Sequence, residues 1–409
     1  MAANATIVRI YRLILAALLA GSLIFHSAIL WESRTKLVAG YGDFIIFYTG
    51  AQIVNDGKSA ELFNVETQNA YQARFDVPQL DWPLPFNHAP YELVLFLPLA
   101  RLSYPMAHAI WTSMNLIFLA IMLGLLLPYV ESRHRFFVGA AVFAWFPTME
   151  ALRLGQDSIM STLLLLAVFV CLKRKRDGLA GICLALGLYK PQLVLPMAGA
   201  FFLSRRWRSA VVFSITGLIL AAISIGIVGL RGVFDFVAIL RSMDEHAFIS
   251  RPALMPNVRG LTHLMLQTVN LVSVSGIIVA GSSLGLYALC VYLWKREIDV
   301  RDPAFDLQFS LTVVTTVLIS YHLYSHDLFP LTLSLILFFR YVASGVITHR
   351  ALSDAFFVLV IILFLPLAPF YLIKSGAFGW AALPILAFYL ILVLEIFRRR
   401  TGQLPEPAF

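Results

Sequence analysis

The chain has 409 residues, of which 60% are hydrophobic and only 13% are charged, and its mean hydropathy is +0.82. Soluble domains carry about 25% charged residues, so the composition excludes a soluble protein and predicts an all-α polytopic membrane protein. The formal net charge of +8 could indicate a nucleic-acid partner, but 19 of the 31 lysines and arginines lie in short clusters between apolar runs. That is the positive-inside pattern of membrane proteins, and it explains the charge with no nucleic-acid partner.

Apolar runs that are long enough to cross a bilayer recur along the chain. A span requires about 20 apolar residues, and six runs have roughly this length: residues 8–30, 105–129, 208–229, 272–294, 352–373 and 380–397. Four runs are shorter: residues 136–149, 155–172, 305–320 and 326–341. With residues 178–203 counted as two crossings, we predict about 11–13 transmembrane helices in a single membrane domain over residues 1–409.

The basic clusters assign the longer loops to the exterior side of the membrane. Residues 31–90 form the first exterior loop, and residues 230–271 form the second large one. Within the first loop, residues 62–75 carry apolar positions near helical spacing, which predicts an amphipathic helix on the membrane surface. Residues 86–101 could be a further short span or an interfacial helix.

The first exterior loop opens with an acidic residue, in the segment YGDFIIFYTGAQIVNDG over residues 41–57. Asp43 precedes the apolar run FIIFYTGAQIV, and this position suits a helix N-cap. A carboxylate held against aromatic residues at a membrane surface could also act as a general base that takes a proton from a hydroxyl. The two interpretations are compatible.

Polar residues also occur in the proline-rich segment WPLPFNHAPYELVLFLPLARL, residues 82–102. His88 and Glu92 are four residues apart and would share one face of a helix. Tyr91 and the neighbouring aromatic residues could hold a sugar or a lipid chain. The alternative is a loop whose prolines only end a helix.

The segment LRLGQDSIM, residues 152–160, lies where one short apolar run ends and the next begins. Arg153 and Gln156 could bind a substrate at this membrane depth, where polar groups are costly and usually face a cavity. The alternative is a tight exterior turn with a surface pair between Arg153 and Asp157.

A lysine lies in the middle of the apolar stretch 178–203, in the sequence LYKPQ. Basic clusters flank this stretch at both ends, so the chain must turn back within it. Pro191 lacks an N–H group and disfavours a helical conformation for the residue before it. We therefore expect two half-helices that meet at Lys190, or two short steep spans. A buried ammonium group predicts an anionic partner such as a phosphate.

Two later segments carry further candidates, RPALMPNVRGLTHLM (residues 251–265) and SYHLYSHDLFP (residues 320–330). Arg259 lies where a long exterior loop re-enters the membrane, and it could equally be a solvated surface residue. His322 and His326 have a spacing that could bind zinc, but a clear third ligand is missing. We expect them to donate hydrogen bonds to a phosphate or a sugar, and we predict no metal site.

The order of these segments resembles glycosyltransferase family 87, which includes mycobacterial mannosyltransferases that depend on polyprenol-phosphate mannose. The resemblance extends over about residues 8–345 and rests on the segments GDFIIFYTGAQIVNDGKSAELF, PFNHAPYELVLFLPLARL, GQDSIM, LYKPQLVLPM, NVRGLTHLM and SYHLYSHDLFPL. It implies the GT-C fold, with many membrane helices and a long first exterior loop. One departure is Asn87-His88-Ala89-Pro90, where the family often has Tyr-Pro-Pro.

The resemblance also implies an activity. The chain would be an inverting transferase of the bacterial inner membrane that moves a hexose, with mannose as the first choice, from a polyprenyl-phosphate sugar to a glycolipid or polysaccharide hydroxyl on the exterior face. Membrane lipids, this donor and this acceptor would be its partners, and no cofactor is expected. Asp43 matches the family's acidic residue after the first span and would be the general base.

The remaining candidates divide between the two substrates. We expect contacts to the donor phosphate or sugar from Arg153, Gln156, Lys190, Arg259, His322 and His326. We expect contacts to the acceptor or its loop from Tyr48, His88, Tyr91 and Glu92. The alternative function is a lipid or sugar transporter or flippase, because transporters also use helices broken inside the membrane.

Overall fold

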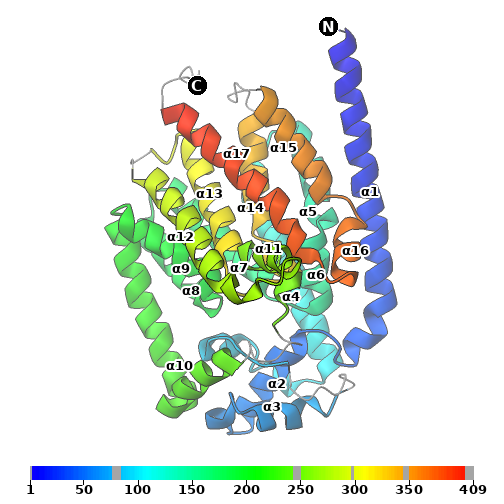
Figure 1. Ribbon diagram of the computed structural model, residues 1–409. Helices are drawn as coiled ribbons and strands as arrows, with labels where there is room; N and C mark the ends of the chain where they lie inside the picture. The colour runs from blue at the N-terminus through cyan, green and yellow to red at the C-terminus, as the bar shows by residue number, and fades with distance from the viewer. Residues whose placement is uncertain (1, 76–83, 243–249, 296–298, 344–349, 401–409) are drawn as a thin grey trace. The chain divides into compact units, whose positions relative to one another are not determined.

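The computed structural model describes residues 2–75, 84–242, 250–295, 299–343 and 350–400, and within these ranges the chain forms helices and no strand (Figure 1). Six helices in this part of the chain are long and apolar enough to cross a membrane: Leu13–Val38, Tyr104–Tyr129, Trp207–Ser242, Val272–Trp294, Ser325–Ala343 and Phe378–Arg400. The number rises to eight if two bent pairs each count as one span, namely Ser132–Ala144 with Phe146–Leu154 and Ala351–Leu363 with Ala368–Lys374. The prediction of an all-α polytopic membrane protein is confirmed.

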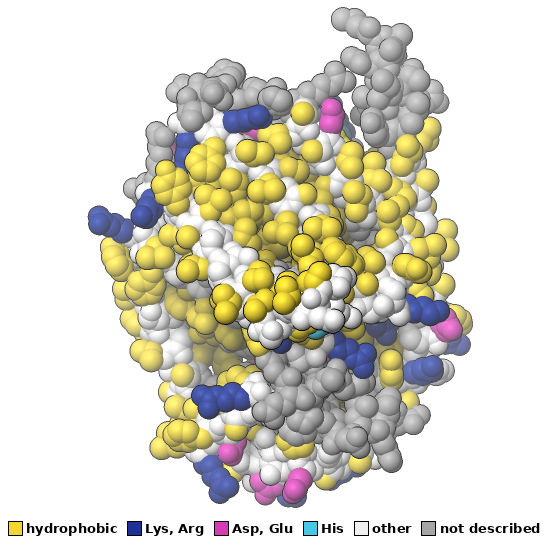
Figure 2. Space-filling view, viewed as in Figure 1, with side chains coloured by type: hydrophobic (Ala, Val, Ile, Leu, Met, Phe, Trp, Pro, Cys, Tyr) yellow, Lys and Arg dark blue, Asp and Glu magenta, His cyan; other side chains and the backbone are white. Residues whose placement is uncertain are grey.

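The predicted count of about 11–13 crossings depends on helices that are shorter than a bilayer is thick. The described residues include five apolar helices of 10–17 residues: Phe44–Asn55, Ser158–Lys173, Asp177–Tyr189, Pro191–Leu203 and Pro303–Ile319. The count therefore stays a prediction. Hydrophobic side chains cover much of the molecular face drawn in Figure 2, as expected of a surface that meets lipid.

The chain divides into two compact units, each built from segments that are distant in sequence. Unit 1 comprises Met1–Trp31, Leu123–Met149 and Pro252–Phe409, and unit 2 comprises Glu32–Met122 and Glu150–Arg251. The predicted single domain over residues 1–409 stays a prediction.

Unit 1 is organised around a helix that is buried on all sides. This helix, α13 (Pro303–Ile319), packs against α12 (Ser275–Trp294), α14 (Leu331–Ala343) and α17 (Ala382–Arg400). Every residue from Ala304 to Leu318 is buried. Its buried polar side chains include Gln308, which donates to the Leu293 carbonyl, and Asp306, which accepts from Arg340. The unit also contains the first part of α1 (Ala2–Val38), α5 (Ser132–Ala144), α11 (Val258–Gln267), α15 (Arg350–Leu363) and α16 (Ala368–Lys374).

Unit 2 holds most of the candidate site. Its elements are α2 (Phe44–Asn55), η1 (Ser59–Glu61), α3 (Val65–Gln72), η2 (Pro90–Leu95), η3 (Leu99–Arg101), most of α4 (Tyr104–Leu126), the end of α6 (Phe146–Leu154), α7 (Ser158–Lys173), α8 (Asp177–Leu186), η5 (Gly187–Tyr189), α9 (Pro191–Leu203) and α10 (Trp207–Ser242). Helix α8 packs against α7 and α10. The backbone of α10 leaves the helical region at Gly229, where φ is 72°, so the predicted span 208–229 ends at this break (Figure 1).

The aromatic residues that follow Asp43 build the core of unit 2. The Phe47 and Phe96 rings stack with their centroids 4.8 Å apart, and Phe96 packs on Trp111 at 4.7 Å. Phe44, Phe47, Phe96 and Trp111 are at most 1% exposed. The FIIFY sequence is therefore apolar because α2 is a core helix of this unit.

The segment 86–101 is not one continuous helix long enough to cross a membrane, which corrects the span alternative, while its interfacial position stays a prediction. It forms the two short 3-10 helices η2 and η3. The physical reason lies in Pro90 and Pro98, because each proline lacks an N–H donor and interrupts a helical hydrogen-bond ladder.

The segment 62–75 contains a helix that is shorter than predicted and partly buried. Helix α3 starts after Asn64, whose side chain accepts a hydrogen bond from the Thr67 backbone N–H at 2.9 Å. Its residues Gln68 and Gln72 face inward. Gln72 exchanges two hydrogen bonds with the backbone of Leu84, and Gln68 accepts one from the Phe86 N–H at 2.9 Å. These bonds hold the backbone that leads to His88.

Candidate active site

Asp43 immediately precedes α2, but its side chain does not cap this helix. Its φ and ψ angles are −83° and −12°, and its carboxylate makes no capping hydrogen bond. Asp43 therefore occupies the predicted N-cap position but does not make the predicted capping hydrogen bond. A capping residue needs a non-helical backbone to direct its side chain at the first amides of the helix. The Asp43 Oδ2 atom instead accepts a hydrogen bond of 2.7 Å from Gln156 Nε2.

The turn between α6 and α7 brings Gln156 to Asp43. The backbone N–H of Asp43 donates to the Leu154 carbonyl at 2.8 Å, and Trp111 Nε1 donates to the Gly155 carbonyl at 2.8 Å. Gly155 has a φ of +69°, and a Cβ atom built on it would lie 2.7 Å from the Cβ atom of Phe44. Only glycine meets both conditions, because it tolerates positive φ and has no side chain to collide.

Arg153 forms an ion pair on its own helix. Its Nε and Nη2 atoms donate to the two carboxylate oxygens of Glu150 at 2.8 and 3.1 Å. The surface pair between Arg153 and Asp157 considered above is therefore wrong, since residues three apart in α6 lie side by side. Arg153 still interacts electrostatically with Asp43.

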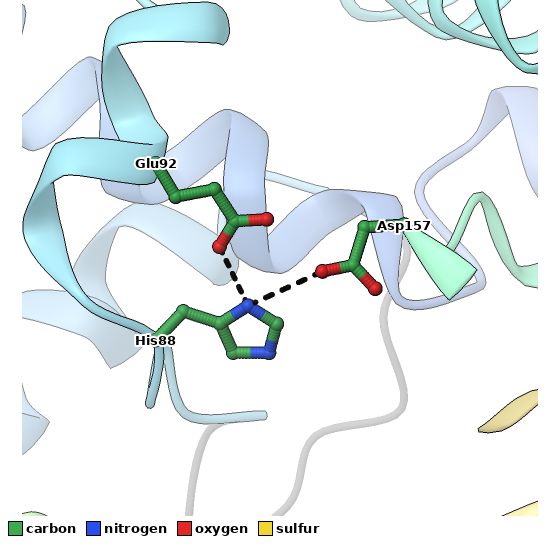
Figure 3. A group of neighbouring side chains, drawn as sticks. All are labelled: His88, Glu92 and Asp157. Atoms are coloured by element: carbon green, nitrogen blue, oxygen red, sulfur yellow. Dashed lines mark hydrogen bonds and ion pairs between the residues drawn. The ribbon is translucent and has the colours of Figure 1, made fainter. Parts of the chain in front are cut away.

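A charge cluster of four residues, here called the buried charge cluster, lies next to this turn. Glu92, Asp157 and Lys190 are buried, and the His88 side chain is 15% exposed. His88 Nδ1 is 2.6 Å from Glu92 Oε2 and 3.5 Å from Asp157 Oδ2 (Figure 3). Lys190 Nζ is 2.5 Å from Asp157 Oδ1 and donates to Ser158 Oγ at 3.1 Å. The Lys190 side chain is 4% exposed and the Asp157 side chain is completely buried. Each residue comes from a loop, a 3-10 helix or a helix end, so tertiary packing alone assembles the cluster.

The electrostatics of the cluster place one proton between His88 and Glu92. Burial raises the pKa of Glu92 to about 7, although the neighbouring His88 opposes this shift. Burial lowers the pKa of His88, but the carboxylates of Glu92 and Asp157 outweigh it and raise the pKa above its ordinary value. For Asp157, burial favours the neutral acid, but Lys190 and His88 lower the pKa below its ordinary value. The upward shifts of His88 and Glu92 both favour a proton at the contact between them.

The predicted helix break at Lys190 is confirmed, and the anionic partner of this lysine is a carboxylate of the same chain. Helix α8 ends at Leu186 and α9 begins at Pro191, with Lys190 between them. The anionic partner is Asp157. The cavity beside Lys190 has a volume of only about 10 Å³, which is about the room for one water molecule. A phosphate would therefore have to open the cluster to reach the ammonium group.

His88, Glu92 and Asp157 are also the residues in the described chain that could ligate a metal ion, because their ligand atoms lie within 4.8 Å of one another. Two observations favour a cluster of charged side chains that share a proton over a metal site. Ligands of one ion at bonds of about 2.0–2.2 Å are usually about 3 Å or more apart, whereas Nδ1 and Oε2 are 2.6 Å apart. The Lys190 ammonium group already neutralises Asp157 and would repel a cation. The prediction that the chain has no metal site stays a prediction.

The two tyrosines expected to contact the acceptor are engaged within unit 2. Tyr48 is 4% exposed, and its hydroxyl donates to the Leu102 carbonyl at 2.7 Å. Tyr91 donates to the Leu186 carbonyl at 3.0 Å. Tyr48 is a core residue, and this placement argues against an acceptor contact.

The last three candidates lie in unit 1. Arg259 stacks over the Tyr321 ring at 3.9 Å and donates to the Tyr321 carbonyl at 3.1 Å. His322 packs edge-on against Tyr324, with ring centroids 4.9 Å apart. His326 Nε2 is 3.3 Å from Asp327 Oδ2. The structure thus groups Arg153, Gln156 and Lys190 in unit 2, and Arg259, His322 and His326 in unit 1.

Comparison with known protein families supplies the class of the chain. The family model of glycosyltransferase family 87 matches residues 86–320. The chain belongs to glycosyltransferase family 87. The resemblance noted from the sequence is therefore confirmed, and the chain is a membrane glycosyltransferase. No curated protein matches it. The matched residues include the whole buried charge cluster and Gln156, whereas Asp43, His322 and His326 lie outside them.

Sequence reasoning missed one functional candidate in this family-87 chain. The sequence places Asp157 beside Arg153 and Gln156 without selecting it as a site residue, yet it is the centre of the buried charge cluster. One signal pointed to it, because a lysine inside an apolar stretch needs a buried counter-ion. Asp157, at the start of the apolar run 158–173, was an available carboxylate at comparable depth.

Proposed function

We propose that this family-87 glycosyltransferase is an inverting enzyme that transfers a hexose, with mannose as the first choice, from a polyprenyl-phosphate sugar to a glycolipid or polysaccharide hydroxyl. The proposal rests on the exposure of Asp43 and on the hydrogen bond that its carboxylate accepts from Gln156. Asp43 is partly exposed, and one of its carboxylate oxygens is held by Gln156 at 2.7 Å. A carboxylate that is fixed but still accessible suits a general base.

The proposed reaction needs a single base. The acceptor oxygen attacks the anomeric carbon and passes its proton to Asp43, while the bond between that carbon and the phosphate oxygen breaks. The electron pair leaves with the polyprenyl phosphate. This leaving group is already a good one and needs charge stabilisation more than a proton. Glycosidases differ because they need two carboxylates.

The donor phosphate needs cations or hydrogen-bond donors, and the ion pairs within the protein bear on the choice of candidates. Arg153 and Lys190 are each paired with a carboxylate of unit 2. We therefore assign Lys190 an indirect role through its ion pair with Asp157. Arg153 and Gln156 remain proposed contacts near Asp43. In unit 1, Arg259, His322 and His326 remain proposed phosphate or sugar contacts.

A lipid-linked donor fits the membrane setting of the chain. Its polyprenyl tail would lie in the bilayer while the sugar phosphate reaches the general base. We place the enzyme in the bacterial inner membrane with its active site on the exterior side, as the basic clusters suggest. No cofactor and no metal are included in the proposal.

The alternative is a transporter or flippase, which the helix break at Lys190 favoured. Transporters use such breaks to expose backbone groups to a substrate, whereas here the break is occupied by the Asp157–Lys190 ion pair. Membership in a glycosyltransferase family also supports transfer.

The test uses the whole protein reconstituted in liposomes with radiolabelled polyprenyl-phosphate mannose and native lipid extract as acceptor. The wild type should release polyprenyl phosphate and label a glycolipid or glycan. Asp43→Asn should lose transfer by about 10²-fold or more while it still folds. Normal turnover by Asp43→Asn would disprove the base assignment. Movement of the donor across the bilayer without its consumption would support the flippase.

A further inference from the structure

The hydrogen bond between Gln156 and Asp43 links the turn between α6 and α7 to the proposed base, and its direction is defined. An ionised carboxylate only accepts hydrogen bonds, so the amide nitrogen of Gln156 must face Asp43 Oδ2, 2.7 Å away. The reverse orientation would place two acceptors against each other. Asp43 therefore determines how the amide of Gln156 is turned.

The other end of the amide has no partner in the part of the chain that the structure describes. Gln156 is 7% exposed, and its Oε1 atom has no hydrogen-bond partner among the residues that the structure describes. Buried polar groups are normally paired, so a glutamine kept only for packing would be expected to satisfy both ends. This side chain engages Asp43 and leaves its second group unpaired.

The backbone around Gln156 is held from several sides. The Gln156 N–H donates to the Ala151 carbonyl at 2.9 Å, and Trp111 fixes the Gly155 carbonyl. The next residue, Asp157, is anchored by Lys190 in the buried charge cluster. The turn therefore presents the amide from a rigid support, which is what a precisely placed catalytic group requires.

We propose that Gln156 is the positioning residue of Asp43, and that the buried charge cluster anchors the turn that presents it. This inference rests on the proposed function of Asp43. With Oδ2 held by the amide, the Oδ1 atom is the oxygen that takes the acceptor proton. Other groups that act electrostatically on Asp43 or with it are Arg153 on α6 and Tyr104 on α4.

The experiment compares Gln156→Leu and Gln156→Glu in the reconstituted transfer assay, with Gln267→Glu on the exposed part of α11 as the matched control. Gln156→Leu should lower kcat by about 10- to 100-fold, because a misaligned group loses this much, with KM within about twofold. Gln156→Glu sets two carboxylates together, and one of them then stays protonated to higher pH. The acidic limb of its profile of kcat/KM against pH should move upward by about one unit or more, with activity recovering at alkaline pH.

Three outcomes would overturn the inference. A rise in KM with unchanged kcat would make Gln156 a substrate contact. An equal loss at every pH, with the acidic limb unmoved in Gln156→Glu, would make it a structural residue. Wild-type profiles in both variants, with Asp43→Asn inactive, would reject this inference and leave the proposed function intact. Normal turnover by Asp43→Asn would instead reject the proposed function. If Gln156→Leu does not fold, the isosteric Gln156→Glu carries the test.

Discussion

Lys190 and Asp157 form an ion pair of 2.5 Å in the interior of unit 2, where both side chains are almost completely removed from solvent. The pair joins the break between α8 and α9 to the start of α7. Removing two charges from water is costly, and their attraction offsets this cost only while both partners are present. The stability of this region should therefore depend on the pair as a whole.

Single substitutions of this pair should destabilise the protein strongly, whereas the double substitution should not. Lys190→Met or Asp157→Leu leaves one buried charge without its partner and should cost about 3–5 kcal/mol. The double variant should recover most of that loss, because an apolar pair of similar volume replaces the charges. Unfolding midpoints in detergent measure both effects, with the exposed Lys58→Met as the control. Single variants as stable as the wild type would show that the ion pair is not structural.

Stability should fall as pH rises from about 5 to 8 because of His88 and Glu92. Both groups have a folded-state pKa above the unfolded value, for Glu92 about 7 against 4.5. The folded state therefore binds more protons than the unfolded state in this window, so raising the pH favours unfolding. The shift of Asp157 is downward and acts only at lower pH. The effect should be on the order of a few kcal/mol.

The measurement is the unfolding midpoint between pH 5 and 8.5 for the wild type and Glu92→Gln. The variant lacks one of the two titrating groups and should show a shallower fall. Glu66→Gln, on the exposed face of α3, is the matched control and should follow the wild type. A wild-type profile that is flat or rises with pH would contradict the shared proton.

Gly155→Ala should reduce both stability and transfer. The new Cβ would lie 2.7 Å from the Cβ atom of Phe44, and alanine would also have to adopt a φ of +69°. The backbone cost alone is about 1–2 kcal/mol, and the collision would displace the turn that carries Gln156. Gly57→Ala is a close control, since Gly57 has a φ of +75° but no atom within 4 Å of its added Cβ. Equal effects of the two substitutions would show that the contact with Phe44 is unimportant.

Transfer should not require a metal bound to His88, Glu92 and Asp157. The positive charge of Lys190 and the 2.6 Å contact between His88 and Glu92 disfavour a second cation in this cluster. Purified protein should carry no stoichiometric transition metal, and treatment with EDTA should leave the transfer rate within about twofold of the untreated value. A bound metal that disappears in His88→Ala would instead establish a metal centre here.

The sequence by itself determined the membrane class, the broken helix at Lys190 and the family. These features depend on local properties, namely the length of apolar runs, the missing N–H of Pro191 and the order of short motifs. The contact between His88 and Glu92 was suggested by their spacing of four residues, but it forms between a loop and the 3-10 helix η2 and not on one face of an α-helix.

Tertiary structure decided which partners these residues have. Lys190 pairs with Asp157, Arg153 turns to Glu150, and the Asp43 carboxylate meets Gln156 in place of its own helix. The partners of Lys190 and Asp43 are distant in sequence, and the contacts depend on how the helices pack. Composition and periodicity carry no information about such distances, because an apolar face specifies burial but not the residue that it meets.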